Sequence, residues 1–297
     1  MKRLLIIDAL NMYFRAYIVD PSLSTNGQPI GGVKGFLKIL QKLVRDTKPD
    51  EIVICWDGEG GSQKRKTKNK GYKEGRKPIR LNRDIRNLSA NEEIANKIWQ
   101  QTRLAEYLNE LPIVQLVLPA VEADDIVSVV SQHPLYNGWQ KVIVSSDKDF
   151  FQLCDNETVV HRPIQKETVN QKSLVEQYGI HPKNFALARA IAGDKSDNLP
   201  GVGGVGLPTV SKRFPFLAEN LSFGTDSLVR DNYRLMQLYT PSLSVQGRKK
   251  IDYALENFEP ELAKTNVKAM MIEDGFGVVN FTDLFAAMNK IVADSKL

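Results

Sequence analysis

The chain of 297 residues is 42% hydrophobic and 25% charged, and its formal net charge is +5. This composition is ordinary for a globular protein with one large domain or two smaller ones. No apolar run approaches the roughly 18 residues of a membrane-spanning helix, and the run after Met1 is too short for a signal peptide. The two cysteines, Cys55 and Cys154, are far apart, and no Cys/His cluster exists. We therefore expect reduced thiols, no structural zinc, no membrane contact and a cytoplasmic location.

Short apolar strands alternate with amphipathic helices along the first half of the chain. The strands lack the alternation of polar and apolar residues that marks a half-exposed sheet. We therefore predict an α/β protein whose parallel sheet is covered by helices on both faces. The predicted strands are Arg3–Ile7, Glu51–Trp56, Val114–Leu118, Trp139–Val144 and Thr158–His161, and the predicted helices are Val33–Val44, Asn91–Leu111 and one that begins at Asp124.

A basic segment runs from Gly61 to Arg86. It holds eleven Lys or Arg residues against Glu74 and Asp84, so it carries +9 and the remainder of the chain carries −4. A local block of positive charge on an otherwise slightly acidic chain favours a specific contact with a polyanion. A solvated loop without a partner is the alternative that the charge alone leaves open.

Carboxylates follow the predicted strands where the strands end. Because ligands of parallel sheets bind beyond the carboxyl ends of the strands, we expect these side chains to converge. Close carboxylates raise one another's pKa, and oxygen ligands without His or Cys select Mg²⁺ or Mn²⁺ to relieve that repulsion. Two such ions about 4 Å apart would stabilise the displacement of a phosphodiester. The alternative for the acids before Ile126 is an ordinary helix start. The converging acids are Asp8, Asp57, Glu122, Asp124, Asp125, Asp147 and Asp149.

A further acidic pair, Asp194 and Asp197, precedes a Gly-rich run that ends at Gly206. Such a run between two short helices can bring backbone amides close to the phosphates of a duplex. A flexible loop is the alternative. We expect the later helices to pack against this unit, and they are predicted at Asn232–Tyr239, Lys249–Leu262 and Asp283–Val292.

Taken in order, these motifs resemble the 5′-3′ exonuclease and flap endonuclease family in its stand-alone bacteriophage form, also called phage RNase H. They are also similar to the N-terminal nuclease part of bacterial DNA polymerase I. The most specific motifs are Val121–Asp125 and Ser146–Phe150. The others are Leu5–Ala9 with Arg15–Tyr17, Gly31–Phe36, Trp56–Gly58, Tyr72–Arg76 and Gly193–Gly206.

The resemblance implies a PIN-like nuclease core with a basic helical-arch insertion and a helical C-terminal part that contains a helix–three-turn–helix. The implied catalytic domain is 1–178, with the arch at 61–100. The implied C-terminal domain is 179–297, with the helix–three-turn–helix at about 184–214.

The resemblance also implies residue roles at two or more Mg²⁺ or Mn²⁺ ions. Lys73 and Arg76 would act as catalytic cations on the scissile phosphate. The ligands of the first ion would be Asp8, Asp57, Glu122 and Asp124; those of the second would be Asp147, Asp149 and Asp194; Asp125 and Asp197 would lie in the outer shell.

The implied nucleic-acid contacts come from the basic segment and the Gly-rich run. The family's Gly-Pro-Lys-Thr is replaced here by Gly206–Thr209, which lacks the phosphate-contacting lysine, so Lys212 or Arg213 is the expected substitute. A K⁺ ion would be held by the backbone carbonyls of Val202 and Val205. The implied nucleic-acid-binding residues are Lys64, Arg65, Lys66, Tyr72, Lys77, Gly201, Gly203, Gly204, Gly206 and Lys212.

The activity implied is Mg²⁺-dependent two-metal-ion hydrolysis at 5′ ends, 5′ flaps and RNA primers on duplex DNA, in primer removal during replication. The implied partners are branched or nicked duplex DNA with a single-stranded 5′ end, RNA–DNA hybrid, and a replication polymerase or single-strand-binding protein. The protein would be a monomer, in the host cytoplasm if a phage encodes it. Two alternatives are a PIN-type ribonuclease and a non-catalytic DNA-junction-binding protein. The long basic insertion counts against the first, and the intact set of acids counts against the second.

Overall fold

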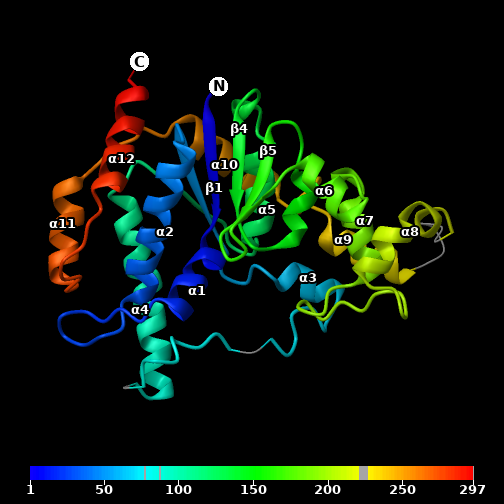
Figure 1. The fold of residues 1–297 in the computed structure, drawn as a ribbon, viewed down its shortest axis with the longest axis horizontal. Coiled ribbons are helices and arrows are strands. Elements are labelled where there is room, and N and C mark those ends of the chain that lie inside the picture. Colours follow the sequence, from blue (N-terminus) through cyan, green and yellow to red (C-terminus); the bar gives the residue numbers. More distant parts are fainter. Residues whose placement is uncertain (77, 87, 221–226, 297) are drawn as a thin grey trace. The chain divides into compact units, whose positions relative to one another are not determined.

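The computed structural model describes residues 1–76, 78–86, 88–220 and 227–296, with the backbone alone at 215–220 (Figure 1). Lys77, an expected nucleic-acid contact, lies outside the described residues. The chain forms two compact units, each with its own core. The first contains 1–56, 78–116 and 250–297, and the second contains 57–77 and 117–249. This division crosses the expected boundary at residue 178, and the expected domains remain a proposal.

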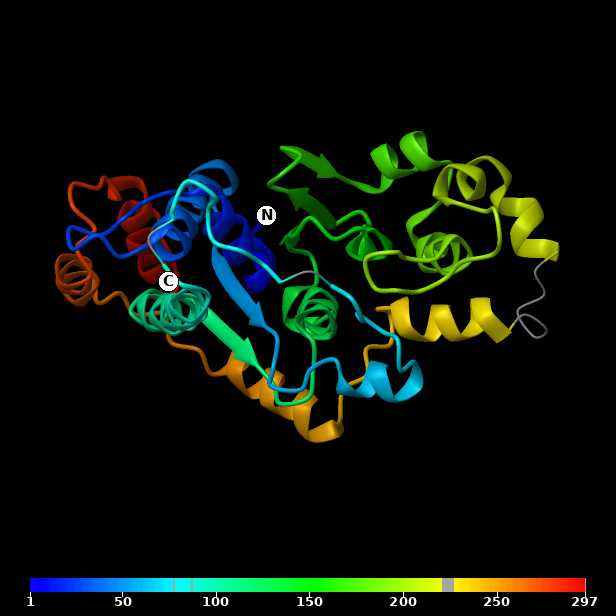
Figure 2. The same cartoon turned by 90° about the horizontal axis from the view of Figure 1, so that it is seen from below.

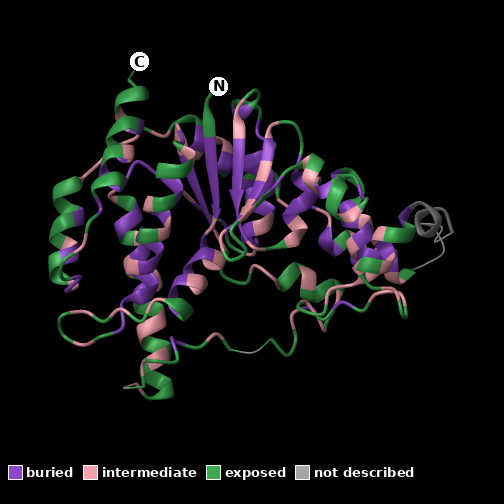
Figure 3. Ribbon diagram, in the orientation of Figure 1, coloured by how far each residue is buried: buried purple, intermediate pink, exposed green. Residues whose placement is uncertain are grey.

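The first unit is built on buried strands at the N-terminus. β1 (Arg3–Asp8) lies between the chain's charged start and α1, and it pairs in parallel with β2 (Glu51–Trp56) so that Leu4 is opposite Glu51. The order is β3-β2-β1, with β3 at Val114–Val117. The four central residues of β1 and of β2 are buried, which is why neither strand alternates between polar and apolar residues (Figure 3).

Helices of the first unit pack around α2 (Gly31–Thr47). Its apolar residues recur at helical spacing and are buried, including Phe36, Leu40 and Val44. α1 (Ala9–Val19), α4 (Ala90–Asn109) and α12 (Thr282–Asp294) pack against it. α4 begins with a capping box in which Ser89 and Glu92 bond each other's backbone amides. The remaining elements are α11 (Lys264–Glu273) and α10 (Val245–Glu256), which crosses the division between the units.

The second unit has a mixed sheet. β4 (Gln140–Val144) is parallel to β5 (Thr158–Arg162), and β5 is antiparallel to β6 (Glu167–Val169). α7 (Pro182–Ala192) packs against α8 (Leu207–Asn220), α9 (Ser227–Met236) and the 3₁₀ turn η2 (Lys148–Leu153), which are green to yellow in Figure 2. The helices and turns are α3 (Gln63–Lys68), α5 (Ala123–Ser131), η1 (Pro134–Tyr136), η2 (Lys148–Leu153), α6 (Gln171–Tyr178), α7 (Pro182–Ala192), α8 (Leu207–Asn220) and α9 (Ser227–Met236).

The α/β prediction is confirmed, and each expected strand is present to within one residue at either end. The expected helix Asn232–Tyr239 is shifted and ends at Met236, because Gln152 bonds the Met236 carbonyl and the Leu238 amide and so draws the chain out of the helix. The expected helix Lys249–Leu262 ends at Glu256. β6, α6 and α11 were not expected. None of the described helices combines the length and apolarity needed to cross a membrane.

The basic segment is only partly helical. Within the expected arch at 61–100, α3 covers six residues and α4 begins at Ala90. The described residues between Asn69 and Ser89 form turns and irregular backbone. Tyr72, Lys73 and Arg76 therefore stand on a turn, and the hydrogen bonds of that turn decide where their side chains lie.

Candidate active site

The acids of the second unit are held by the starts of helices and turns. Glu122 is the N-cap residue of α5, and Asp124 and Asp125 lie in the first turn of that helix. Asp147 caps η2 and accepts the amide of Asp149 at 2.8 Å. Asp57 ties two segments together because it accepts the amide of Ala123 at 2.9 Å. Asp57 and Asp147 therefore satisfy backbone amides that the starts of α5 and η2 leave without partners.

Asp8 belongs to the first unit. It is the last residue of β1 and caps α1 by accepting the amide of Asn11 at 3.2 Å. Its convergence with the acids of the second unit remains a prediction.

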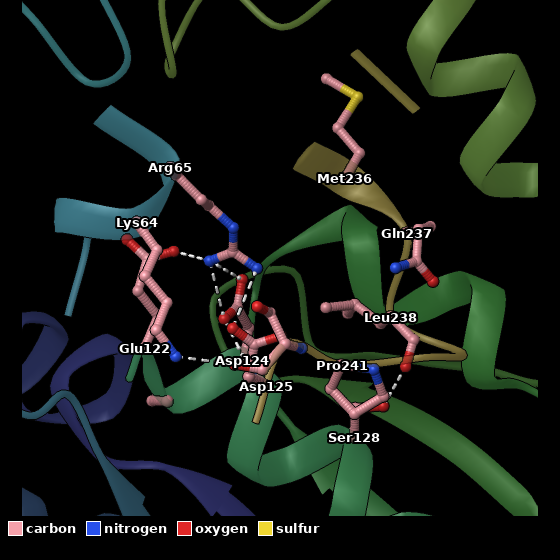
Figure 4. Close-up of polar contacts among 12 residues, drawn as sticks. Lys64, Arg65, Glu122, Asp124, Asp125, Ser128, Met236, Gln237, Leu238 and Pro241 are labelled. Atoms are coloured by element: carbon pink, nitrogen blue, oxygen red, sulfur yellow. Dashed lines mark hydrogen bonds and ion pairs between the residues drawn. The ribbon is translucent and has the colours of Figure 1, made fainter. Parts of the chain in front are cut away.

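Arg65 lies among the acids of α5 (Figure 4). Its guanidinium is 3.0 Å from Asp124 and 3.4 Å from Asp125, and it also pairs with Glu122. Only 11% of the Arg65 side chain and 4% of the Glu122 side chain are exposed. Burial alone would lower the pKa of Arg65, but the negative charges of Asp124 and Asp125 raise it above its usual range. Arg65 is therefore a permanent internal counter-charge.

The Tyr72–Arg76 turn reaches the same acids. Lys73 pairs with Glu122, and the Tyr72 hydroxyl donates to the other oxygen of that carboxylate at 3.2 Å. Arg76 pairs with Asp197 and donates to the Ser196 carbonyl at 3.1 Å. The Lys73 residue has a φ of +57°, and its amide donates to the Asp197 carbonyl at 2.9 Å. The structure thus brings together both predicted catalytic cations and predicted metal ligands from α5 and the 194–198 loop.

Arg189 lies at the centre of a second group of ion pairs, in addition to the group around Arg65. From the last turn of α7 it donates to Asp149 at 2.9 Å and pairs with Asp194. Between 12% and 15% of each of these three side chains is exposed. Asp194 also accepts the amide and the hydroxyl of Ser196, at 2.8 and 2.6 Å. Acids from η2 and from the Gly-rich loop are therefore joined through one arginine.

Several buried acids of this site have raised pKa values. Removal from water, together with the charge of a neighbouring carboxylate, raises the pKa of Asp57, Asp125 and Asp147. The same causes raise the pKa of Asp149 to about 7. Asp194 is the exception, since burial would raise its pKa but the bonds from Ser196 and the charge of Arg189 lower it. The basic side chains therefore offset the cluster only in part.

This donor set fits hard divalent cations. It consists of carboxylate oxygens, without His or Cys, which is the preference of Mg²⁺ and Mn²⁺. Within the described residues, no three Asp, Glu, His or Cys side chains stand grouped as metal ligands. The carboxylates are turned instead toward Arg65, Lys73, Arg76 and Arg189, which occupy the positions of counter-cations.

The other expected contacts of the basic segment lie in different surroundings. Arg65 and Tyr72, which we expect from the sequence to contact nucleic acid, lie against Glu122, and Tyr72 is 3% exposed. Their nucleic-acid contacts remain a prediction. Lys64 donates to the Ser242 carbonyl at 3.1 Å, and the Lys66 side chain is exposed. Lys64 and Lys66 are therefore the exposed residues of this set.

The Gly-rich run contains two kinds of glycine. A Cβ on Gly201 would lie 2.2 Å from the Ala192 carbonyl oxygen, so this glycine lets two backbone segments pack closely. A Cβ on Gly203 or Gly204 would meet no atom within 4 Å. The Val202 carbonyl accepts the Val205 amide at 3.0 Å in a turn.

Lys212 is exposed on α8, and Gly206 stands just before that helix. α7, the 193–206 loop and α8 span the expected helix–three-turn–helix, and that motif with its K⁺ ion remains a prediction.

Arg189 is the residue that sequence reasoning missed. It stands in an otherwise apolar stretch, Phe185–Ala192, where a lone charge on a buried helix signals a buried partner. That signal does not identify the partner, because Asp149 is 40 residues away in sequence.

The chain is similar in sequence to known 5′-3′ exonucleases. Residues 3–179 match the family model of the 5′-3′ exonuclease, N-terminal resolvase-like domain. The chain is 26% identical over 295 residues to a 5′-3′ exonuclease of Aquifex aeolicus, covering 92% of this chain and 95% of the relative. It is 31% identical over 211 residues to a 5′-3′ exonuclease of Buchnera aphidicola, covering 70% of this chain and 68% of the relative. It spans 33% of the thermostable DNA polymerase I of Thermus thermophilus, at 27% identity.

Solved structures share the fold. A bacteriophage T5 flap endonuclease in a complex with DNA and metal ions has a TM-score of 0.60 at 15% identity, over 100% of both chains. Flap endonuclease-1 of Methanococcus jannaschii has a TM-score of 0.52 at 14% identity, over 98% of this chain and 93% of its own. On the strength of the match over residues 3–179 and of the relatives above, this chain belongs to the 5′-3′ exonuclease family.

Proposed function

We propose that the protein is a divalent-metal-dependent structure-specific 5′ nuclease that hydrolyses phosphodiesters at 5′ ends, 5′ flaps and RNA primers on duplex DNA. The observation that carries the proposal is the carboxylate cluster of the second unit. Acids from α5, η2 and the 194–198 loop lie near enough there for their charges to interact, and burial raises the pKa of several of them. If the protein bound no cations, replacing such acids with apolar residues of similar volume would stabilise the fold.

The proposed metal ligands are those that the family resemblance implies, and all but Asp8 belong to the second unit. Bound Mg²⁺ would act there as a Lewis acid on the phosphodiester and lower the pKa of a water nucleophile. The residues that would hold the first ion are Asp57, Glu122 and Asp124, with Asp8 from the first unit; those for the second are Asp147, Asp149 and Asp194; Asp125 and Asp197 would support them from outside.

The cations of the cluster divide by exposure. Arg65 and Arg189 are 11% and 12% exposed, each pairs with more than one acid, and we assign them to holding the acids in place. Lys73 and Arg76 are more exposed, at 23% and 50%, and each pairs with one acid. We assign Lys73 and Arg76 to the scissile phosphate, where a positive charge stabilises the charge that develops in the transition state.

Nucleic-acid binding is proposed for the exposed part of the basic segment and for the Gly-rich loop. Phosphate contacts of Lys and Arg make affinity fall as salt is raised. Lys66, Gly203, Gly204 and Lys212 are accessible for such contacts. The T5 neighbour, which shares the fold, was crystallised with DNA and metal ions, and this supports a DNA substrate here.

A substrate panel tests the proposal. A 5′-flap duplex, a nicked duplex, an RNA primer annealed to DNA, and single-stranded RNA would each be labelled and incubated with Mg²⁺ or with a chelator. We expect Mg²⁺-dependent cutting of the first three, and we expect Asp147→Asn to abolish it while Glu256→Gln, an exposed acid on α10, does not.

Other outcomes of the panel select the alternatives. Cutting of single-stranded RNA alone would identify a PIN-type ribonuclease. Tight flap binding without cutting at any Mg²⁺ concentration would identify a junction-binding protein. Cutting in the chelator would contradict the metal-dependent mechanism.

A further inference from the structure

A groove of about 920 Å³ lies on the first unit, between α11, the loop that follows it and α12. It lies outside residues 3–179, which match the nuclease family model. Its inner surface includes Met271, Phe281 and Phe285, and its rim includes Lys264 and Lys268. None of the activity proposed above uses these residues.

Residues of α4 and α2 hold the loop that forms one wall of the groove. Asp274 accepts the Tyr107 hydroxyl at 2.6 Å and Arg103 at 2.8 Å. The Phe276 ring packs 5.5 Å from the Tyr107 ring, and Lys34 donates to the Phe276 carbonyl at 2.8 Å. A groove on such a support is preformed, and a preformed site costs a ligand less ordering entropy.

The groove leaves apolar side chains in water. Val278 is 104% exposed and Ile272 is 82% exposed, which places them among the most exposed large apolar residues of the described chain. Leaving apolar surface uncovered forgoes about 25 cal/mol for each Å². Apolar patches rimmed by polar residues mark interaction sites on protein surfaces.

The charge at the rim is of one sign. The lining contains Lys264 and Lys268 and no Asp or Glu. The Lys264 ammonium stands 5.2 Å from the centre of the Phe285 ring. Two acids beside the lining residues are engaged elsewhere, since Glu273 pairs with Arg103 and Asp283 pairs with Arg45. The groove therefore favours a ligand that is apolar in the middle and negative at one end.

We propose that this groove binds a short peptide segment of a partner protein, with two or more apolar anchor residues followed by acidic residues. The apolar anchors would cover Met271, Val278 and Phe281, and the acids would meet Lys264 and Lys268. A nucleic acid fits less well, because only two cations stand beside a mainly apolar lining.

Selection from a displayed library of random peptides tests this without presuming a sequence. The bait is the full chain, and Val278→Asp is the counter-selection bait; Val278 is fully exposed, so the variant should fold. We expect enriched peptides that join apolar residues to Asp or Glu. Labelled copies should bind the wild type in fluorescence anisotropy. They should lose at least about tenfold in affinity to the Lys264→Glu/Lys268→Glu variant, which corresponds to about 1.4 kcal/mol.

The matched control is Lys42→Glu, an exposed lysine of α2 that does not line the groove, and it should bind as the wild type does. Absence of groove-dependent enrichment, enrichment of basic peptides, or equal binding by the Lys264→Glu/Lys268→Glu variant would overturn the proposal. Two further results would also overturn it. One is a dimer in sedimentation that Val278→Asp dissolves, which would make a second copy the occupant. The other is displacement of the peptide by laurate at equal affinity, which would make a fatty carboxylate the occupant.

Discussion

The carboxylate cluster of the second unit and the apolar groove of the first unit both lower the stability of the free protein, but by different physics. In the cluster the cost is electrostatic, since buried acids repel one another and four basic side chains only partly offset them. In the groove the cost is hydration of apolar surface at Ile272 and Val278. The first cost responds to cations and pH, and the second responds only to a ligand that covers the groove. Variants should therefore separate the two regions.

The largest expected effect is on catalysis. Asp147→Asn removes a proposed metal ligand at nearly constant volume, and we expect the cleavage rate of a 5′-flap duplex to fall by about 10³-fold or more. Its affinity for that duplex in Ca²⁺ should stay within a few-fold of the wild type. Val278→Asp, in the groove, should leave both values unchanged. A comparable rate loss in Val278→Asp would break the separation between the regions.

Arg189→Met tests the internal counter-charges. It removes the partner of Asp149 and Asp194, and loss of one side of such a buried pair costs about 3 kcal/mol or more of unfolding free energy. Urea denaturation of the metal-free protein measures this. Saturating Mg²⁺ should return more stability to the variant than to the wild type. Equal gains from Mg²⁺ in both proteins would show that the arginine and the metal do not share these acids.

Lys73→Ala should act on the chemical step. Removing a cation that contacts the phosphate only in the transition state lowers kcat by about 10²-fold. Single-turnover cleavage should therefore slow by that factor while KM changes little. A change confined to KM would contradict the assigned role of Lys73.

The loop that carries Asp194 and Asp197 offers a matched pair of glycines. Gly201→Ala places a methyl group 2.2 Å from the Ala192 oxygen, and such overpacking costs about 1–3 kcal/mol of unfolding free energy. Gly203→Ala meets no atom and should be neutral to within about 0.5 kcal/mol. Thermal unfolding of the two variants gives the comparison. Equal melting temperatures would contradict the close backbone contact.

A further prediction concerns the pH dependence of the metal-free protein. The pKa of Asp149 is raised to about 7, so the folded state holds this proton more tightly than the unfolded chain does. Its contribution is therefore complete below the unfolded pKa, near 4, and is lost as the pH rises through about 7. Asp149→Asn should flatten the fall in stability between pH 5 and pH 8, and Asp231→Asn, at an exposed acid on α9, should not. A profile that is the same for all three proteins would contradict the raised pKa.

The extent to which the sequence predicts these features depends on whether they are local. Strand positions and the acids that follow them were predictable, because Asp57 and Asp147 occupy fixed places relative to buried apolar runs. The Arg189 pairs were not, since they depend on tertiary packing between α7 and η2. The pairing of Arg65 with the acids of α5 was not predictable either, because in sequence Arg65 is one of eleven basic residues in the same segment. The groove combines α11, a loop and α12, and no single segment carries its pattern.

Manganese titration tests the central claim most directly. The metal-free protein would be titrated with Mn²⁺, and the free ion would be followed by electron paramagnetic resonance. We predict saturable binding of at least two ions per chain, with at least one lost in Asp194→Asn and none lost in Glu256→Gln. Absence of saturable binding, or binding that is the same in Asp194→Asn as in the wild type, would contradict it.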